Sequence, residues 1–180
     1  MFKGIGNLFK SYKGVTVDPK QSHLTIKNTD VSLVLLRPYD LVYLGELVGS
    51  GSEDILILVG KIIGKKISTE IEKRDAPKKL EKKYQAVLET LMNMGFGKFT
   101  LKFDEYKSAV VKVKDPISNT IKDKNEAKVL CNLYNGLFLG MFSQDSEADG
   151  EEKQCVLNST AEKHFDECIF EYKLARKEEE

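Results

Sequence analysis

The chain reads KFTLKFDEYKSAVVKVK from residue 98 to residue 114, and this stretch decides the class of fold. Apolar and polar residues alternate in two runs, Phe99–Phe103 and Ala109–Val113, which is the period of β-strands with one buried face. Asp104 and Glu105 separate the two runs, so we expect an antiparallel hairpin. A sheet with one apolar face has to bury that face against another layer of secondary structure.

The residues before this hairpin follow the period of helices instead. Apolar residues recur every three or four positions in three segments, which we expect to be helices: Leu41–Val48, Ile55–Ile71 and Leu80–Met94. Short strands are expected between residues 15 and 36, and residues 1–30 are expected to form a lead-in that contains the first of them. One domain is then expected over residues 31–175, followed by a frayed tail at 176–180.

The residues after the hairpin are expected to contain one more helix and two more strands. Residues 127–142 are apolar and predict an extended start followed by a buried helix, and the acidic residues 144–153 predict a surface loop. Cys155–Leu157 and Cys168–Leu174 predict strands. Strands and helices thus occur in separate runs, which predicts an α+β fold with helices packed on a mainly antiparallel sheet.

The composition excludes several classes of protein. The chain has 180 residues, of which 41% are apolar, and its 28 basic residues balance 28 acidic ones. Such a chain is long enough for one domain with its own core, and its zero net charge argues against general nucleic-acid binding. It has no apolar run that could span a membrane and no signal peptide at its start, so a cytoplasmic protein is expected. Three cysteines cannot all pair, which disfavours a disulfide framework.

One group of side chains has the chemistry of a metal site. Cys131, Glu152, Cys155 and Cys168 offer three thiolates and a carboxylate, a ligand set that suits tetrahedral zinc. The alternative is that the three cysteines are simply small buried apolar residues. His164 lies four residues before Cys168 and is the substitute ligand. No arrangement of residues indicates a catalytic centre.

Paired glycines mark a possible binding pocket. Gly60 and Gly64 fall in one expected helix and Gly136 and Gly140 in another, which permits the close approach of a second helix or of a ligand. Aromatic residues are frequent near these glycines. We therefore expect an apolar pocket between helices and sheet, lined by Gly60, Ile63, Gly64, Phe99, Leu101, Tyr134, Gly136 and Phe138. The lysines Lys78, Lys79, Lys82 and Lys83, by contrast, are expected to form a solvated helix face.

The order of these motifs resembles the vinyl-4-reductase (4VR) domain family. The resemblance covers about Val31 to Leu174 and rests on short motifs in the right order: Gly60-x3-Gly64, the Met94-Gly-Phe-Gly-Lys98 step, Cys131-x4-Gly136-x3-Gly140, Glu152-x2-Cys155 and Cys168. It implies an α+β domain, usually dimeric, that binds small apolar molecules and holds a structural zinc on Cys131, Glu152, Cys155 and Cys168. A related fold occurs in subunits of vesicle-tethering complexes. Twelve residues separate Cys155 from Cys168, more than is usual, which leaves Cys168, His164 or water as the last ligand.

Three functions follow as expectations. The first is a zinc-containing module that binds a small hydrophobic molecule and acts as a sensor, a carrier or an accessory protein, passing any signal by contact with a protein partner. The second is a reductase or accessory enzyme acting on a vinyl-bearing tetrapyrrole, although the chain lacks a dinucleotide-binding glycine motif. The third is a homodimeric interaction scaffold, with the helix Leu41–Val48 and the isoleucine-rich helix supplying the interface.

Overall fold

The hairpin around residue 105 belongs to a sheet that four helices cover on one side. A computed structural model describes residues 15–18, 23–26, 32–33, 36–75, 77, 79–160, 162 and 164–177. Its main sheet contains four antiparallel strands in the order β4-β5-β7-β6: β4 Lys98–Asp104, β5 Ser108–Lys114, β6 Ser146–Gln154 and β7 Glu167–Arg176. The helices are α2 Pro38–Val48, α3 Ser52–Asp75, α4 Leu80–Asn93 and α5 Lys124–Phe142. The expected α+β fold is confirmed.

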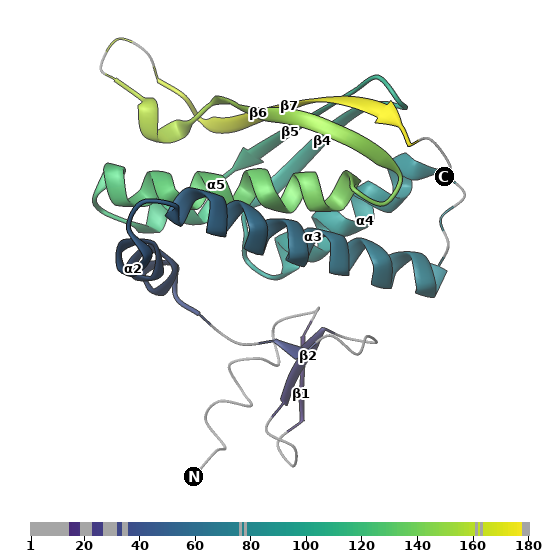
Figure 1. Cartoon of the computed structure of the whole chain (residues 1–180), viewed down its shortest axis with the longest axis horizontal. Helices are drawn as coiled ribbons and strands as arrows, with labels where there is room; N and C mark the ends of the chain where they lie inside the picture. Colours follow the sequence, from purple (N-terminus) through teal and green to yellow (C-terminus); the bar gives the residue numbers. More distant parts are fainter. Residues whose placement is uncertain are drawn as a thin grey trace.

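The layers are stacked in the order sheet, α5, α3, as Figure 1 shows. The most buried helix is α5, because its apolar residues face the sheet on one side and α3 on the other. It begins at Asp123, whose side chain accepts hydrogen bonds from the backbone N–H groups of Asn125 and Glu126, the usual satisfaction of a helix start. The core lies between these layers and is rich in aromatic rings, such as Tyr84 against Phe142 and Phe138 against Phe170.

The paired glycines bring α3 and α5 into backbone contact. A Cβ atom on Gly60 would lie 2.4 Å from the carbonyl oxygen of Leu133, and one on Gly64 would lie 2.1 Å from that of Leu137. Gly136 and Gly140 face the backbone of α3 in the same way, with Cβ positions 2.1 and 2.2 Å from carbonyl oxygens. Of the two roles expected for these glycines, the structure shows the close approach of a second helix.

The region after α5 differs from the expectation. Residues 144–153 were expected to be a surface loop, but Ser146–Gln154 forms β6, an edge strand that pairs with β7 except at one irregularity between Glu152 and Gln154. Cys155–Leu157 was expected to be a strand, but a single 3-10 turn, Val156–Asn158 (η2), follows β6 there. Residues 127–142 have no extended start, because α5 is already helical from Lys124. These three predictions were wrong, while β4, β5 and β7 form as expected.

Strands also lie near both ends of the chain. The backbone of Val15–Asp18 (β1), His23–Ile26 (β2) and Ser32–Leu33 (β3) forms a separate antiparallel sheet, in agreement with short strands in this region. Arg176, placed in the expected tail, is the last residue of β7, and residues 178–180 lie outside the described residues. Within the described part of the chain, no helix is both long and apolar enough to cross a bilayer.

Lys83 is not on a solvated face, contrary to expectation. Its residue surface is only 2% exposed, and its ammonium group donates to Glu72 Oε2 at 2.7 Å and to Asp145 Oδ2 at 2.9 Å. The hydroxyl of Tyr84 also donates to Asp145, at 3.2 Å. A buried charge is tolerated when it is paired and hydrogen-bonded in this way, so Lys83 connects α3 and α4 to the turn that precedes β6.

Candidate metal centre and neighbouring groove

Three elements bring the cysteines together at one end of the sheet. Cys131 lies on the face of α5 that meets the sheet, Cys155 follows the end of β6, and Cys168 is the second residue of β7. All three side chains are buried thiols. The Sγ atoms of Cys131 and Cys155 are 3.5 Å apart, and those of Cys155 and Cys168 are 3.9 Å apart. Residues far apart in the sequence thus form one cluster of sulfur atoms.

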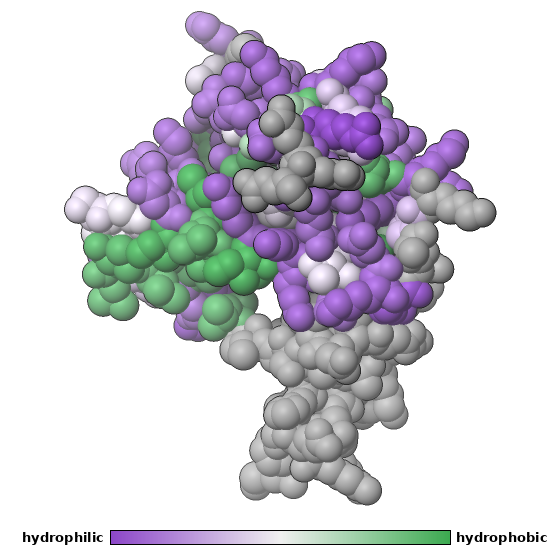
Figure 2. Space-filling view, turned by 45° about the vertical axis from the view of Figure 1, so that its right-hand side comes forward, coloured by the Kyte–Doolittle hydropathy of each residue, from purple (hydrophilic) through white to green (hydrophobic). Residues whose placement is uncertain are grey.

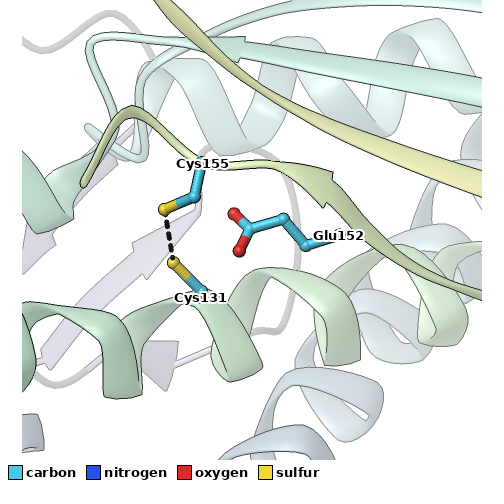
Figure 3. Close-up of side chains that lie close together, drawn as sticks. All are labelled: Cys131, Glu152 and Cys155. Atoms are coloured by element: carbon cyan, nitrogen blue, oxygen red, sulfur yellow. Dashed lines mark hydrogen bonds between the residues drawn. The ribbon is translucent and has the colours of Figure 1, made fainter. Parts of the chain in front are cut away.

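Glu152 completes the cluster with a carboxylate. Its carboxylate oxygen and the sulfur atoms of Cys131 and Cys155 all lie within 4.8 Å of one another. Figure 3 shows the carboxylate directed toward these two sulfurs, with α5 on one side and β6 on the other. One carboxylate oxygen, Oε1, is buried and has no hydrogen-bond partner among the described residues. Such an unpaired buried oxygen is costly, unless a ligand that the carboxylate can bind satisfies it.

An irregularity in β6 explains how Glu152 and Cys155 face the same side. Residues three apart on a regular strand point to opposite faces of the sheet. The pairing of β6 with β7 shifts between Glu152 and Gln154, and the strand then gives way to the turn of η2. A bulge of this kind re-aims the side chains that follow it. The backbone N–H of Val156 in that turn donates to Cys168 Sγ at 3.4 Å, which fixes the sulfur of β7 as well.

The electrostatics of the cluster concentrate negative charge on one sulfur. Hydrogen bonds from Cys131 and Cys168 lower the pKa of the Cys155 thiol, because both stabilise its thiolate. The same hydrogen bonds, together with burial, raise the pKa of Cys131 and of Cys168. Burial and the neighbouring charge of Cys155 raise the pKa of Glu152 to about 7. Four such groups in one buried place cannot all be ionised together unless a cation balances their charge.

The substitute ligand expected from the sequence lies elsewhere. The imidazole of His164 is 76% exposed, and its Nε2 atom is 3.0 Å from Asp166 Oδ1. It is not among the described side chains that could share one metal ion with Cys131 and Cys155.

A polar groove opens beside the cluster. Its volume is about 370 Å³, and it lies between the start of α3, the exposed face of α5 and β6. Cys131 and Glu152 form part of its wall, and the other lining residues are Glu53, Asn125, Lys128, Val129, Asn132, Asn135 and Glu151. This groove was not predicted from the sequence. The signal for it is the set of polar residues at positions 125, 128, 132 and 135, which are spaced so as to share one face of a helix.

The residues of the expected apolar pocket lie in the core instead. Tyr134 and Phe138 are 1% and 0% exposed, and their rings contact Phe99, Phe170 and each other. The Tyr134 hydroxyl donates to the carbonyl oxygen of Phe96 and accepts from the backbone N–H of Ile117. Ile63 and Leu101 are half-buried and pack against the same core. Neither the groove beside the cysteines nor a second hollow of about 450 Å³ over α3, α5 and β6 is lined by these residues.

Comparisons with known proteins relate the chain to others by structure alone. No protein-family model matches the sequence, and no curated protein matches it. The phenol-responsive sensory domain of the transcription activator PoxR, solved with phenol, is similar with a TM-score of 0.67 at 11% identity; 97% of this chain and 91% of that chain are covered. This likeness is one of fold.

Two further solved structures share the architecture. One is trafficking protein particle complex subunit 3 from Naegleria fowleri, covalently bound to palmitic acid, with a TM-score of 0.54 at 10% identity over 79% of this chain and 93% of that one. The other is an H-NOX protein from S. oneidensis in the Fe(II)NO ligation state, with a TM-score of 0.52 at 11% identity over 87% and 86% of the two chains. At these identities the comparison supports the expected fold, while membership in the 4VR family stays a prediction.

Proposed function

We propose that this chain is a binding module for a small hydrophobic molecule, braced by a structural zinc ion, that works in the cytoplasm as a sensor, carrier or accessory protein. The observation that carries the proposal is the group of Cys131, Glu152 and Cys155, whose ligand atoms all lie within 4.8 Å of one another. Cys168 is not part of that group, but its Sγ atom lies 3.9 Å from that of Cys155. The expected homodimer is a separate prediction, for which the exposed apolar residues of α3 are the relevant observation.

The donor atoms fit zinc. Zinc binds thiolate sulfur at about 2.3 Å, so two sulfurs of one tetrahedral site lie about 3.8 Å apart. The two sulfur–sulfur distances here, 3.5 and 3.9 Å, lie on either side of that value. The unpaired Oε1 atom of Glu152 would supply the oxygen ligand. Three thiolates and a carboxylate would close the coordination shell, which favours a structural role over a catalytic one.

The fold and the aromatic core support a hydrophobic ligand. Two of the structural neighbours carry phenol or palmitic acid in their solved structures. In this chain the space between the helices and the sheet is occupied by aromatic rings, including Phe99, Tyr134 and Phe138. A ligand can bind there only if some of these rings move apart. We assign this movement to the rings of Phe96 and Phe99, because they are half-buried, whereas Tyr134 and Phe138 are fully buried.

The test is ligand stabilisation with two defined probes, phenol and palmitic acid. A ligand present at a hundred times its Kd stabilises a protein by about 2.7 kcal/mol, which raises Tm by roughly 5 to 10 °C for a chain of this size. We expect one probe to raise Tm, and the substitution Phe99→Ala to strengthen the effect by enlarging the site. Glu89→Ala, at an exposed position on α4, is the matched control. If neither probe raises Tm, and native mass spectrometry of protein from its own host shows no retained apolar molecule, the proposed ligand class is wrong.

A further inference from the structure

The hollow over α3, α5 and β6 is separate from the candidate metal centre. Its volume is about 450 Å³, which is in the range of sites for small molecules. Leu139, one of its lining residues, lies eight positions after Cys131 on α5, about 12 Å along the helix axis. On β6 the hollow is at the start of the strand, whereas Glu152 is near its end. A ligand in this hollow would therefore bind independently of a metal on the cysteines.

Three lysines line the hollow. Lys61 and Lys65 are four residues apart on α3 and thus share one face of the helix. Both are exposed, and neither forms an ion pair with another residue in the described part of the chain. Lys177 follows the end of β7, and its ammonium group donates to the backbone carbonyl oxygen of Ser143 at the end of α5. That bond uses one of the three N–H donors of the ammonium group.

The hollow is positively charged, although the chain as a whole has no net charge. Among its described lining residues the three lysines are accompanied by one carboxylate, that of Glu147, which leaves an excess of two positive charges. The neighbouring carboxylate of Asp145 does not reduce this excess, because Lys83 donates to both of its oxygens. Charges of one sign around a concave surface attract ligands of the opposite sign. The hollow therefore favours an anion.

The hollow also has an apolar part. Ile62 of α3, Leu139 of α5 and Ala148 of β6 belong to its lining. Large apolar side chains are exposed on α2 and α3, and Figure 2 shows an apolar area at the left of the view; Ile62 is one of these side chains and is 61% exposed. An inorganic anion would leave this apolar surface in contact with water. An anion that carries an apolar group would cover it, which is favourable.

We propose that this hollow binds a phosphate monoester that carries an apolar group. Such a phosphate has a charge of about −1.5 to −2 at pH 7 and three strong acceptor oxygens, which suit two excess positive charges and three ammonium groups. Lysines bind as separate point charges, whereas the planar carboxylate is matched best by the fork of an arginine. The apolar group of the ligand would lie against Ile62, Leu139 and Ala148. This inference depends neither on zinc nor on a ligand in the aromatic core.

The first test is calorimetry of the full chain with hexyl phosphate, inorganic phosphate and hexanoate. Hexyl phosphate should bind once per chain, at least about tenfold more tightly than either of the other two probes. The double variant Lys61→Met, Lys65→Met should weaken its binding by at least about tenfold. Lys102→Met, at an exposed position on β4, is the matched control and should leave binding unchanged. All of these side chains are exposed, so circular dichroism should show that both variants remain folded.

Three results of this experiment would overturn the proposal. If inorganic phosphate binds as tightly as hexyl phosphate, the hollow is a general anion site without an apolar part. If hexanoate binds as tightly, the assignment to phosphate is wrong. If the double variant binds hexyl phosphate like the wild type, or if Lys102→Met weakens binding equally, the ligand does not occupy this hollow.

The second test separates two sources of the phosphate monoester, a soluble molecule and a lipid headgroup. Sedimentation with phosphatidylcholine vesicles, with and without phosphatidic acid, measures binding to the headgroup. Sedimentation that requires both phosphatidic acid and the lysines Lys61 and Lys65 would identify a lipid as the source. Binding of hexyl phosphate without such sedimentation would identify a soluble ester. A chain that binds neither hexyl phosphate nor the phosphatidic acid vesicles would contradict the proposal.

Discussion

Single residues set the distance between α3 and α5. At Gly64 the absent side chain is replaced by the carbonyl group of Leu137, and at Gly140 by that of Lys61. Backbone atoms cannot turn aside as a flexible side chain can, so any added carbon at these positions pushes the two helices apart. The helix contact therefore depends on glycine for space, rather than for an unusual backbone conformation.

We accordingly expect Gly64→Ala to destabilise the protein by about 2 kcal/mol or more, because overpacking a tight contact commonly costs 1 to 3 kcal/mol. Gly45→Ala on α2 is the matched control, since its new Cβ would meet side-chain atoms alone, a methyl group of Val129 at 3.3 Å and Cβ of Ser52 at 3.6 Å. The control should change stability by less than about 1 kcal/mol, because alanine also favours the helix. Urea unfolding measures both values, and equal effects would contradict the packing described here.

Lys83 is a second position at which one side chain is expected to have a large effect on the stability of the protein. Replacing it by Met should destabilise the protein by roughly 3 kcal/mol, because the largely buried carboxylate of Asp145 would lose its cation. Lys82→Met, at the exposed position next to it, should stay within about 0.5 kcal/mol of the wild type. Denaturation curves of the two variants provide the comparison. A tolerant Lys83→Met variant would show that the ion pairs with Glu72 and Asp145 add little.

At the scale of elements, the periodic segments were predictable and β6 was not. The helices and the hairpin have apolar residues at regular intervals, which is the pattern that burial of one face requires. In β6 the inward positions hold small or polar residues such as Ala148 and Gly150, and the outward ones are mostly acidic, so hydropathy does not alternate. Charged edge strands of this kind avoid pairing with other chains. The ends of β6 and α5 depend on tertiary pairing, which a single sequence does not display.

The candidate site, too, has features that could be predicted from the sequence and features that depend on tertiary pairing. Residue chemistry suggested that Cys131, Glu152, Cys155 and Cys168 could share a metal, and the resemblance implied the same set. The bulge that turns Glu152 and Cys155 to one side is a property of the β6–β7 pairing. Likewise, the partners of Lys83 come from α3 and from the turn before β6, far from the lysine-rich segment in sequence. The kinds of metal-ligating residue could thus be predicted from the sequence. Their arrangement could not, because it depends on the pairing of elements that are far apart in the chain.

Hydrogen exchange tests whether β6 is a strand. The backbone amides of β6 that pair with β7 should exchange slowly, because exchange requires this ladder to open. Peptides covering residues 146–154 should therefore be protected, while the adjoining turn around His164 and Asp166 should exchange fast. Mass spectrometry of the full chain after short labelling gives both rates. Similar fast exchange in the two segments would show that residues 146–154 form a loop, as their composition suggests, rather than a strand.

At the scale of the whole molecule, the cysteine cluster lies where the central helix α5 meets the sheet. Cys131 belongs to the central helix, Cys155 follows the end of the edge strand β6, and Cys168 lies at the start of β7, its neighbour in the sheet. A cation bound by all of them would connect α5 to the sheet at the end where the polar groove opens. Because thiol and carboxyl groups bind metals only when they are deprotonated, the affinity of this site for the cation should weaken as the pH falls.

The most direct measurement of this central claim is zinc content with X-ray absorption spectroscopy of the purified full chain. We predict about one zinc per chain, with sulfur neighbours at about 2.3 Å and one shorter bond to oxygen. Cys155→Ser and Glu152→Gln should lose most of the metal and lower Tm, while Glu151→Gln, at the exposed neighbouring position, should keep both. A protein without stoichiometric zinc, or zinc retained without sulfur neighbours, would contradict the account.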